Sequence, residues 1–407
     1  MRVLIVSQYF WPESFRINEV ATALRDAGCE VCILTGQPNY PDGQVFERYS
    51  ACAITAQNYQ GLDVFRVPIV PRGRGSALRL MMNYLSFIFS AGVLGPWLLR
   101  GRLFDAVLVF APSPILQAIP AIWLARFKRA VLLTWVQDLW PESLSASGFV
   151  KNRTMLEWVG AVVRWIYRHN DCLLVQSEAF IAPVTAISGG TPVRYHPNPG
   201  DLASANAPES VTEFPVAFGS GFNVIFAGNL GTVQALDTVL QAAVLLRSEH
   251  DISFILVGSG SRSDWLQSEI ARLGLENVRL AGRFPLSAMP AIFESASALL
   301  VSLVRSPIMR QTVPSKVQAY LAAGKPIIAA LDGEGSRIVE EAGAGVTCPA
   351  ENAEALAVVV KQLRDMPIGE RERMGANGIA YYQKNFEPRM LAKRLKQILN
   401  DTSRRPR

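Results

Sequence analysis

Short runs rich in β-branched residues alternate with helix-length segments through most of the chain. In the first half these runs cover residues 3–6, 31–35, 64–67, 107–110, 131–136 and 173–176. In the second half they cover residues 224–227, 252–257, 278–280, 299–302 and 327–330. Such spacing is typical of βαβ units, which build a parallel sheet with helices on both faces. The sequence therefore predicts an α/β chain made of doubly wound, Rossmann-like domains.

The alternation lapses in one stretch that is rich in Ala, Ser and Pro. We interpret residues 201–221 as a linker between an N-terminal domain, 1–200, and a C-terminal domain, 222–385. Helical spacing over 386–400 predicts a last helix, which we expect to pack back on the N-terminal domain. A length of 407 residues suffices for two such domains. A cleft is expected between them, since ligands of doubly wound sheets bind beyond the carboxyl ends of the strands.

Cysteine usage and the first residues of the chain favour a cytoplasmic protein. The five cysteines are odd in number and scattered, which is atypical of a disulfide framework. Cys29 and Cys32 form a Cys-x-x-Cys pair, but a structural zinc site needs four ligands and no second pair is present. The first apolar run is also shorter than the core of a signal peptide.

Positive charge is concentrated in one region. The net charge is +6, yet residues 66–129 alone contain nine basic residues and one acid, Asp105. Within this region, residues 80–99 are uncharged and long enough to span a membrane. Their position between two strands of one sheet argues against a span. An interfacial helix on anionic lipid headgroups and an ordinary sheet-covering helix are the two alternatives. We expect peripheral attachment to the inner face of the plasma membrane and no nucleic-acid partner.

Several common nucleotide sites are missing from the sequence. The turn at 7–13 has no Gly-x-Gly-x-x-Gly and the chain has no Walker A motif, which argues against dinucleotide and P-loop sites. No Asp-x-Asp pair is present to clamp a metal on a nucleotide diphosphate. Gly258 and Gly260 follow a predicted strand and open a helix, where free backbone N–H groups can hold a phosphate.

Several motifs that follow one another along the chain carry a family resemblance. They are QYFWPE at 8–13, FRIN at 15–18, TGQPNYP at 35–41, DLWPES at 138–143, AGNLG at 227–231, VPSK at 313–316 and LAAGKP at 321–326. Together they resemble the retaining family-four glycosyltransferases with the GT-B fold. The branch they are most similar to is that of the L-fucosamine transferases of bacterial O-antigen and capsule assembly.

This resemblance implies two Rossmann-like domains that face a central cleft, with a separate role for each. The N-terminal domain is expected to bind the acceptor, a polyprenyl-diphosphate-linked saccharide. The C-terminal domain is expected to bind a UDP-activated sugar, with N-acetyl-L-fucosamine as the predicted sugar. Transfer with retention then depends on stabilising the leaving diphosphate, and neither a metal nor another cofactor is expected.

Donor-site residues also follow from the resemblance. The family's pyrophosphate-binding Arg and Lys correspond to the neutral Asn229 and Gln234, which leaves Lys316 as the main predicted catalytic cation. The second family glutamate corresponds to Ala319, which leaves Gln318 as the candidate ribose contact. The full predicted donor set is Gly228, Asn229, Gln234, Gly258, Gly260, Arg283, Arg310, Gln311, Ser315, Gln318, Gly335 and Ser336.

Predicted acceptor-site residues follow the strands of the N-terminal domain. Asp138 comes just after the run at 131–136 and is the predicted contact of the acceptor hydroxyl, with a helix N-cap as the alternative. Glu13 follows the first strand at the same sheet edge and is predicted to be catalytic. The remaining predicted acceptor contacts are Arg16, Asn39, Tyr40, Trp140 and Glu142.

Two further functions fit the same pattern. One is a non-hydrolysing nucleotide-sugar 2-epimerase, which shares the fold but needs carboxylates and histidines around the sugar ring. The chain has only three histidines. The other is a non-catalytic sugar-binding scaffold at the membrane surface, which the replaced glutamates would permit.

Overall fold

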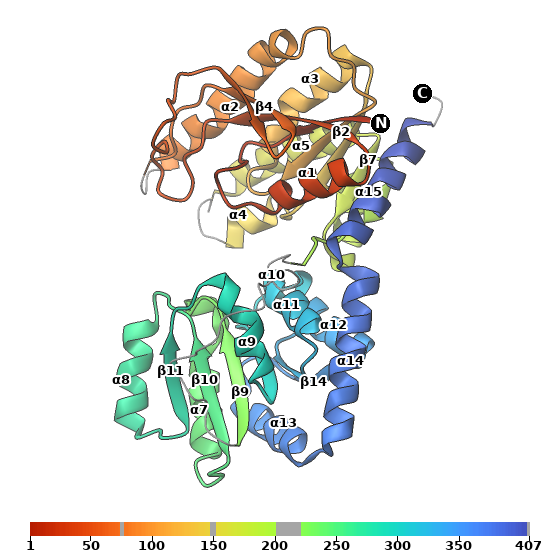
Figure 1. Cartoon of the computed structure of the whole chain (residues 1–407). Coiled ribbons are helices and arrows are strands. Elements are labelled where there is room, and N and C mark those ends of the chain that lie inside the picture. Colours follow the sequence, from red (N-terminus) through yellow and green to blue (C-terminus); the bar gives the residue numbers. More distant parts are fainter. Residues whose placement is uncertain (74–76, 147–151, 201–220, 405–407) are drawn as a thin grey trace. The chain divides into compact units, whose positions relative to one another are not determined.

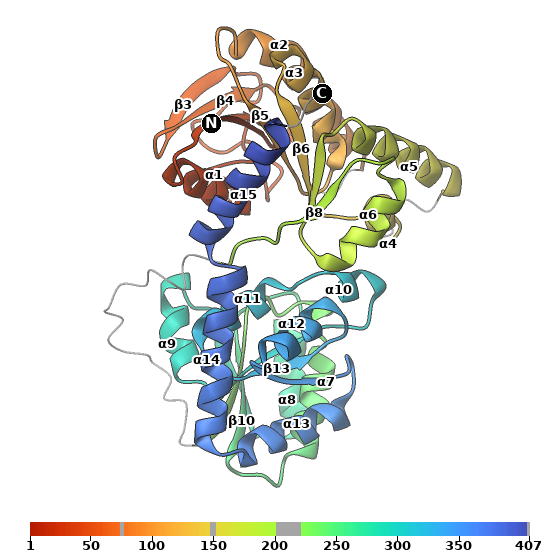
Figure 2. The same cartoon turned by 90° about the vertical axis from the view of Figure 1, so that its right-hand side faces the viewer.

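The computed structural model describes residues 1–73, 77–146, 152–200 and 221–404. The chain divides into two compact units, each with its own sheet (Figures 1 and 2). Unit 1 combines Met1–Pro199 with Pro388–Arg407, and unit 2 is Gly200–Glu387. The predicted linker lies outside the described residues apart from Gly221.

Unit 1 is built on an eight-stranded sheet. Its strands are β1 (Arg2–Val6), β2 (Glu30–Gly36), β3 (Thr55–Tyr59), β4 (Leu62–Val67), β5 (Ala106–Ala111), β6 (Val131–Val136), β7 (Cys172–Val175) and β8 (Val193–Tyr195). They lie in the order β3-β4-β2-β1-β5-β6-β7-β8, and all neighbours are parallel except β3 and β4. The predicted parallel sheet is confirmed. The short strands β3 and β8 escaped prediction because neither contains a continuous apolar run.

Helices cover both faces of this sheet. They are α1 (Arg16–Asp26), α2 (Ala77–Leu98), α3 (Ala118–Lys128), α4 (Glu142–Ala146), α5 (Arg153–Arg168), α6 (Ile181–Ile187) and α15 (Pro388–Ser403). Side chains of α1 and α15 pack in one core cluster, and side chains of α2, α3 and α5 pack in the other. Because successive strand residues point to opposite faces, β1 contributes Leu4 and Val6 to one cluster and Val3 and Ile5 to the other.

Unit 2 repeats this plan with six parallel strands. They are β9 (Phe222–Ala227), β10 (Ile252–Val257), β11 (Val278–Gly282), β12 (Ala298–Ser302), β13 (Ile327–Ala330) and β14 (Gly345–Cys348). Their order is β11-β10-β9-β12-β13-β14. Strands β10 and β11 are therefore added on one side of β9, and β12, β13 and β14 are added on the other side. Doubly wound folds bind their ligands at this reversal.

The helices of unit 2 follow its strands in alternation. They are α7 (Leu236–Leu245), α8 (Ser263–Leu273), α9 (Met289–Glu294), α10 (Pro307–Gln311), α11 (Ser315–Ala323), α12 (Glu334–Ala342), α13 (Ala353–Asp365) and α14 (Ile368–Asn385). Local sequence sets several of their ends. The Asn352 side chain accepts a hydrogen bond from the Ala355 N–H at the start of α13, and Gly324 ends α11 in the left-handed conformation.

Candidate functional site

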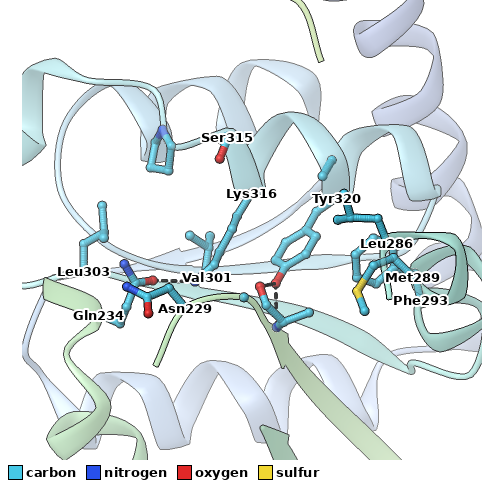
Figure 3. Close-up of a pocket in the computed structure, with 14 residues that line it drawn as sticks. Asn229, Gln234, Leu286, Met289, Phe293, Val301, Leu303, Ser315, Lys316 and Tyr320 are labelled. Carbon is cyan, nitrogen blue, oxygen red and sulfur yellow. Dashed lines mark hydrogen bonds between the residues drawn. The ribbon is translucent and has the colours of Figure 1, made fainter. Parts of the chain in front are cut away.

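A pocket of about 450 Å³ lies at the carboxyl ends of β9 and β12, where the strand order of unit 2 reverses (Figure 3). It is lined by Ala227, Gly228, Asn229, Gln234, Leu286, Met289, Phe293, Val301, Leu303, Pro314, Ser315, Lys316, Ala319 and Tyr320. The first three residues come from the end of β9 and the turn after it, and the last four come from the start of α11. The pocket thus occupies the position at which a doubly wound sheet binds a ligand.

Lys316 is the only charged side chain among the residues that line this pocket. Its ammonium group donates a hydrogen bond to Gln234 Oε1 (Figure 3). The same group lies 3.6 Å from the centre of the Phe226 ring. Burial lowers the pKa of Lys316 to about 7, because the ammonium is separated from water without a carboxylate to compensate. A phosphate bound beside Lys316 would supply the missing negative charge.

Two glycines bring the walls of the pocket together. Gly228 has a φ of 138°, and a Cβ at this position would lie 2.6 Å from Lys316 Cε. Gly258 also has a φ of 138°, and its Cβ would lie 1.8 Å from the carbonyl oxygen of Gly228. Only glycine fits both the backbone conformation and the available space. The sequence predicted that Gly258 holds a phosphate, and the structure shows in addition that Gly258 lies against the backbone of Gly228.

Hydrogen bonds hold Gln234 and Tyr320 in place around Lys316. Ser302 Oγ donates to the carbonyl oxygen of Gln234 at 2.7 Å, which ties the 3₁₀ turn at Thr232–Gln234 to the end of β12. The Tyr320 hydroxyl accepts from the Ala227 N–H at 3.0 Å, which ties α11 to the end of β9 (Figure 3). Lys316 therefore projects from a helix that is fixed to the sheet on which the pocket is built.

The structure brings part of the predicted donor set together. Gly228, Asn229, Gln234, Ser315 and Lys316 line the pocket. Three further glycines adjoin its walls without lining it. A Cβ at Gly258, Gly260 or Gly335 would lie 1.8 Å from Gly228 O, 2.6 Å from Asn229 Oδ1 or 3.0 Å from Pro314 Cδ, respectively. The pocket lining excludes the remaining predicted donor residues, which are Arg283, Arg310, Gln311, Gln318 and Ser336.

One half of the pocket is apolar, and the sequence analysis did not single out its residues. Leu286 comes from the 3₁₀ turn after β11, Met289 and Phe293 come from α9, Val301 comes from β12, and Leu303 follows β12. In the sequence these residues resemble ordinary core positions. The one feature of the sequence that could have indicated a pocket is that these residues lie at or after the carboxyl ends of predicted strands.

In unit 1, the Glu13 carboxylate joins the turn after β1 to the turn after β2 through three backbone hydrogen bonds. Its Oε1 accepts hydrogen bonds from the N–H groups of Asn39 at 2.8 Å and Tyr40 at 2.7 Å. Its Oε2 accepts from the Phe10 N–H at 3.3 Å. The carboxylate is buried. Glu13 thus fixes the turn after β1 against the turn after β2, which places Asn39 and Tyr40 beside it and favours a positioning role over a catalytic one.

Burial raises the pKa of Glu13 to about 7, although the three N–H groups and nearby Arg66 act in the opposite direction. Folding therefore favours the protonated acid, and the stabilisation this provides is present below pH 4.5 and lost as the pH rises through 7. Between pH 5 and pH 8, we expect this group to lower the free energy of unfolding of unit 1 by on the order of 2 to 3 kcal/mol.

Urea unfolding followed by tryptophan fluorescence measures this effect, since seven of the eight tryptophans belong to unit 1. In the Glu13→Gln variant, the free energy of unfolding should change less with pH than it does in the natural chain. Glu30→Gln, at an exposed position of β2, is the matched control and should keep the natural dependence. An equal pH dependence in Glu13→Gln and the natural chain would show that Glu13 does not titrate in this range.

The other predicted acceptor residues differ in accessibility. Asp138 follows β6, and burial raises the pKa of its carboxyl although the Ser113 N–H donates to it. Trp140 packs in the core of unit 1, which makes it a support of this loop with no free ring face. Glu142 begins α4 and is exposed, and Arg16 lies 4.0 Å from Glu19 at the start of α1.

A second pocket, of about 580 Å³, lies in unit 1 beside the turn after β1. Trp11 and Pro12 of the first motif line it together with Tyr49 and Gln57. The Trp11 ring stacks on Tyr59 with 4.8 Å between the ring centres, which holds one wall in place. Throughout the described residues, no three His, Cys, Asp or Glu side chains gather closely enough to hold a metal ion.

Family models match both halves of the chain. Residues 14–200 match the model described as "Glycosyl transferase 4-like domain". Residues 215–381 match the model described as "Glycosyl transferases group 1". The two matches follow one another without overlap and together span most of the chain. They agree with the family resemblance of the motifs and with the presence of two units.

Two curated proteins are similar over much of their length. A "Probable glycosyltransferase WbjE" of Pseudomonas aeruginosa is 26% identical over 327 residues, which cover 75% of this chain and 76% of that protein. A "Putative colanic acid biosynthesis glycosyl transferase WcaI" of Escherichia coli is 25% identical over 395 residues, which cover 90% and 93%.

Solved structures share the fold at lower identity. Sucrose-phosphate synthase from Thermosynechococcus elongatus matches with a TM-score of 0.69 and 16% identity, over 98% of both chains. Anabaena Alr3699/HepE, solved in complex with UDP, matches with a TM-score of 0.67 and 14% identity, over 98% of this chain and all of that one. The predicted GT-B fold is thereby confirmed.

Proposed function

Because the chain belongs to the group 1 glycosyltransferases, we propose that it transfers a sugar with retention from a UDP-activated donor bound in the pocket of unit 2. The observation that carries this proposal is the single buried cation of that pocket. Lys316 has a lowered pKa and no acidic partner among the residues that line the pocket, so it is suited to an anionic ligand. A UDP molecule carries such a charge on its diphosphate.

In this mechanism the bond between the anomeric carbon and the diphosphate oxygen breaks while a bond to the acceptor oxygen forms on the same face of the sugar, and the proton of the acceptor hydroxyl passes to the leaving diphosphate oxygen, so that UDP is released. Lys316 stabilises the charge that develops on the leaving diphosphate. The N–H groups of Gly228, Leu230, Gly258 and Gly260 donate hydrogen bonds within the protein, so the backbone N–H groups of Asn229 and Ser259 are the candidate further donors of these turns. The apolar half of the pocket then receives parts of the donor that need no charged partner.

We propose that unit 1 binds the acceptor. Asp138 is its candidate contact with the acceptor hydroxyl, and Glu13 holds the neighbouring turns in place. The pocket beside Trp11 offers a second position for the acceptor saccharide. Support for this division comes from the match of residues 14–200 to a separate family model.

The finer proposal is transfer of N-acetyl-L-fucosamine to a polyprenyl-diphosphate-linked saccharide during surface polysaccharide synthesis. It is supported by the motif resemblance to the L-fucosamine transferases and by the name of the Escherichia coli relative, which refers to colanic acid biosynthesis. A screen of nucleotide sugars with a lipid-linked acceptor, read by mass spectrometry, tests it. Transfer of another sugar would replace the predicted donor, an epimerised donor would indicate the 2-epimerase, and an unchanged donor would indicate a binding scaffold.

Turnover is expected to persist when divalent cations are removed by a chelator. The reason is that the sequence contains no Asp-x-Asp pair to hold a metal on the diphosphate, and Lys316 supplies positive charge in its place. The measurement is the transfer rate in excess chelator, with and without added Mg²⁺ or Mn²⁺. A rate that vanishes in chelator and returns only with a divalent ion would contradict metal-independent transfer.

A further inference from the structure

Helix α2 exposes a continuous apolar stripe. Leu78, Leu85, Phe89, Val93 and Trp97 follow one another at steps of four or seven residues and are all exposed. Phe89 is 72% exposed and Trp97 is 60% exposed. The opposite side of the helix carries a buried stripe at steps of four residues, Asn83, Phe87, Ala91 and Gly95, so apolar residues lie on both sides of α2 although only one side packs on the sheet.

Helix α3 lies beside α2 on the same face of the sheet and extends this apolar surface (Figures 1 and 2). Its Trp123 is 58% exposed, and its Phe127, one turn later, is 67% exposed. We call the exposed side chains of Phe89, Val93, Trp97, Trp123 and Phe127 the α2–α3 surface. Contiguous apolar surfaces of this kind mark binding sites for proteins or membranes.

Basic residues flank the α2–α3 surface at the C-terminal ends of both helices. Arg100 follows α2, Arg126 belongs to α3 and Arg129 follows α3, and all three are exposed. Within the described part of the chain, none of the three forms an ion pair. Neither helix contains an acidic residue. Aromatic side chains between basic ones are typical of segments that lie in the headgroup region of a bilayer.

Among the described residues, α2 is the one helix that is long and apolar enough to cross a membrane. Its hydrogen bonds oppose a spanning position. The buried Asn83 side chain accepts from Gln8 Nε2 at 2.6 Å and donates to the Val70 carbonyl oxygen at 2.7 Å. These bonds tie the inner side of α2 to the sheet, so the helix can present only its outer side to a bilayer.

We propose that the α2–α3 surface binds an anionic lipid bilayer, with its aromatic side chains at headgroup depth and its arginines on lipid phosphates. A second copy of the chain is the alternative occupant. A two-fold dimer through this surface would bring together two copies of a surface that carries positive charge and has no acidic residue on either helix. The charge pattern therefore favours a negatively charged partner. This inference concerns unit 1 alone and is independent of the donor chemistry.

Flotation of the full chain with vesicles tests the proposal. The vesicles contain phosphatidylcholine, with or without phosphatidylglycerol, at low and at high salt. Binding is expected to require the anionic lipid and to weaken with salt. The combined Arg100→Gln, Arg126→Gln and Arg129→Gln variant should bind about 100-fold more weakly at low salt, at roughly 1 kcal/mol for each basic residue.

The combined Phe89→Glu and Trp97→Glu variant should lose flotation altogether, because two carboxylates then replace the apolar contacts. Ile368→Glu is the matched control, since Ile368 is 66% exposed on α14 of unit 2 and should float as the natural chain does. Urea unfolding followed by tryptophan fluorescence, which reports mainly on unit 1, checks that unit 1 of each variant is folded, and UDP binding checks that unit 2 is folded. If the natural chain did not bind UDP, that result would count against the proposed function, whereas the flotation experiment would still test lipid binding by unit 1.

Two results would overturn the proposal. One is a natural chain that does not float with anionic vesicles. The other is a Phe89→Glu and Trp97→Glu variant that floats as well as the natural chain. A concentration-dependent dimer that this variant abolishes, together with no flotation of the natural chain, would assign the surface to a second copy.

Discussion

Replacing Lys316 with alanine is expected to lower the transfer rate by roughly 10²- to 10³-fold, comparable to the loss of one donor from an oxyanion hole. Lys316 is the only charged side chain that lines the pocket of unit 2, and the usual basic positions of the family hold Asn229 and Gln234. The variant should bind UMP almost normally and lose affinity for UDP, because only the second phosphate needs the ammonium. Steady-state kinetics and calorimetry with the two nucleotides measure these effects.

A second variant separates the charge of Lys316 from its packing. The aliphatic part of Lys316 lies against Gly228, so alanine removes a contact as well as a charge. Lys316→Met keeps most of the aliphatic chain and should lose the rate nearly as completely as Lys316→Ala. Lys384→Met is the matched control, because Lys384 is exposed on α14 of the same unit and should retain full activity. If the role of Lys316 were purely structural, Lys316→Met would keep the transfer rate of the natural chain.

The pH dependence of UDP binding gives an independent signature. Burial lowers the pKa of Lys316 to about 7, so the free site is half protonated near neutral pH. A bound diphosphate favours the charged ammonium, and the affinity for UDP should therefore fall as the pH rises above 7. Lys316→Met should lack that change. If turnover in a folded Lys316→Ala variant falls less than about fivefold, a change of ~1 kcal/mol in the barrier, Arg283, Arg310 or the backbone amides hold the diphosphate.

The fold could be predicted because its central strands are buried on both faces. A parallel strand of this kind is apolar at most positions, so β1, β6 and β10 are recognisable as nearly continuous apolar runs. The edge strands β3 and β14 carry no such requirement, and their sequences resemble loops. The uncharged segment at 80–99 predicted a helix, and α2 covers Ala77–Leu98. The sequence could not show which side of this helix the sheet buries.

The site was predictable to a smaller extent. Motifs pointed to Gly228 and Lys316, and the parallel sheet places the ends of their elements at one edge. The hydrogen bond between Lys316 and Gln234 depends on how a 3₁₀ turn is tied to β12, which no local pattern reveals. In the sequence, a carboxylate that follows a strand is equally consistent with a catalytic residue and with a residue that holds two turns together. Only its three backbone partners distinguish the role of Glu13.

Gly258→Ala is expected to destabilise unit 2 by on the order of 3 kcal/mol or more and to abolish UDP binding. The methyl group would meet the backbone carbonyl of Gly228, which cannot move aside as a flexible side chain can. The two turns are also joined by hydrogen bonds, from the Gly228 N–H to the Val257 carbonyl at 2.8 Å and from the Leu230 N–H to the Ser259 carbonyl at 3.0 Å. Separating the turns breaks these bonds and displaces the wall that faces Lys316.

Hydrogen exchange read by mass spectrometry on peptides from β9 and β10 measures the loss locally, while peptides from unit 1 should keep their protection. Gly274→Ala is the matched control. Gly274 also has a positive φ, of 61°, but open space surrounds the position of its Cβ. It should cost only about 1 kcal/mol and leave UDP binding unchanged. If Gly258→Ala keeps the hydrogen-exchange protection and the UDP affinity of the natural chain, the turns after β9 and β10 do not touch in solution. The close approach at Gly258 would then not shape the donor pocket.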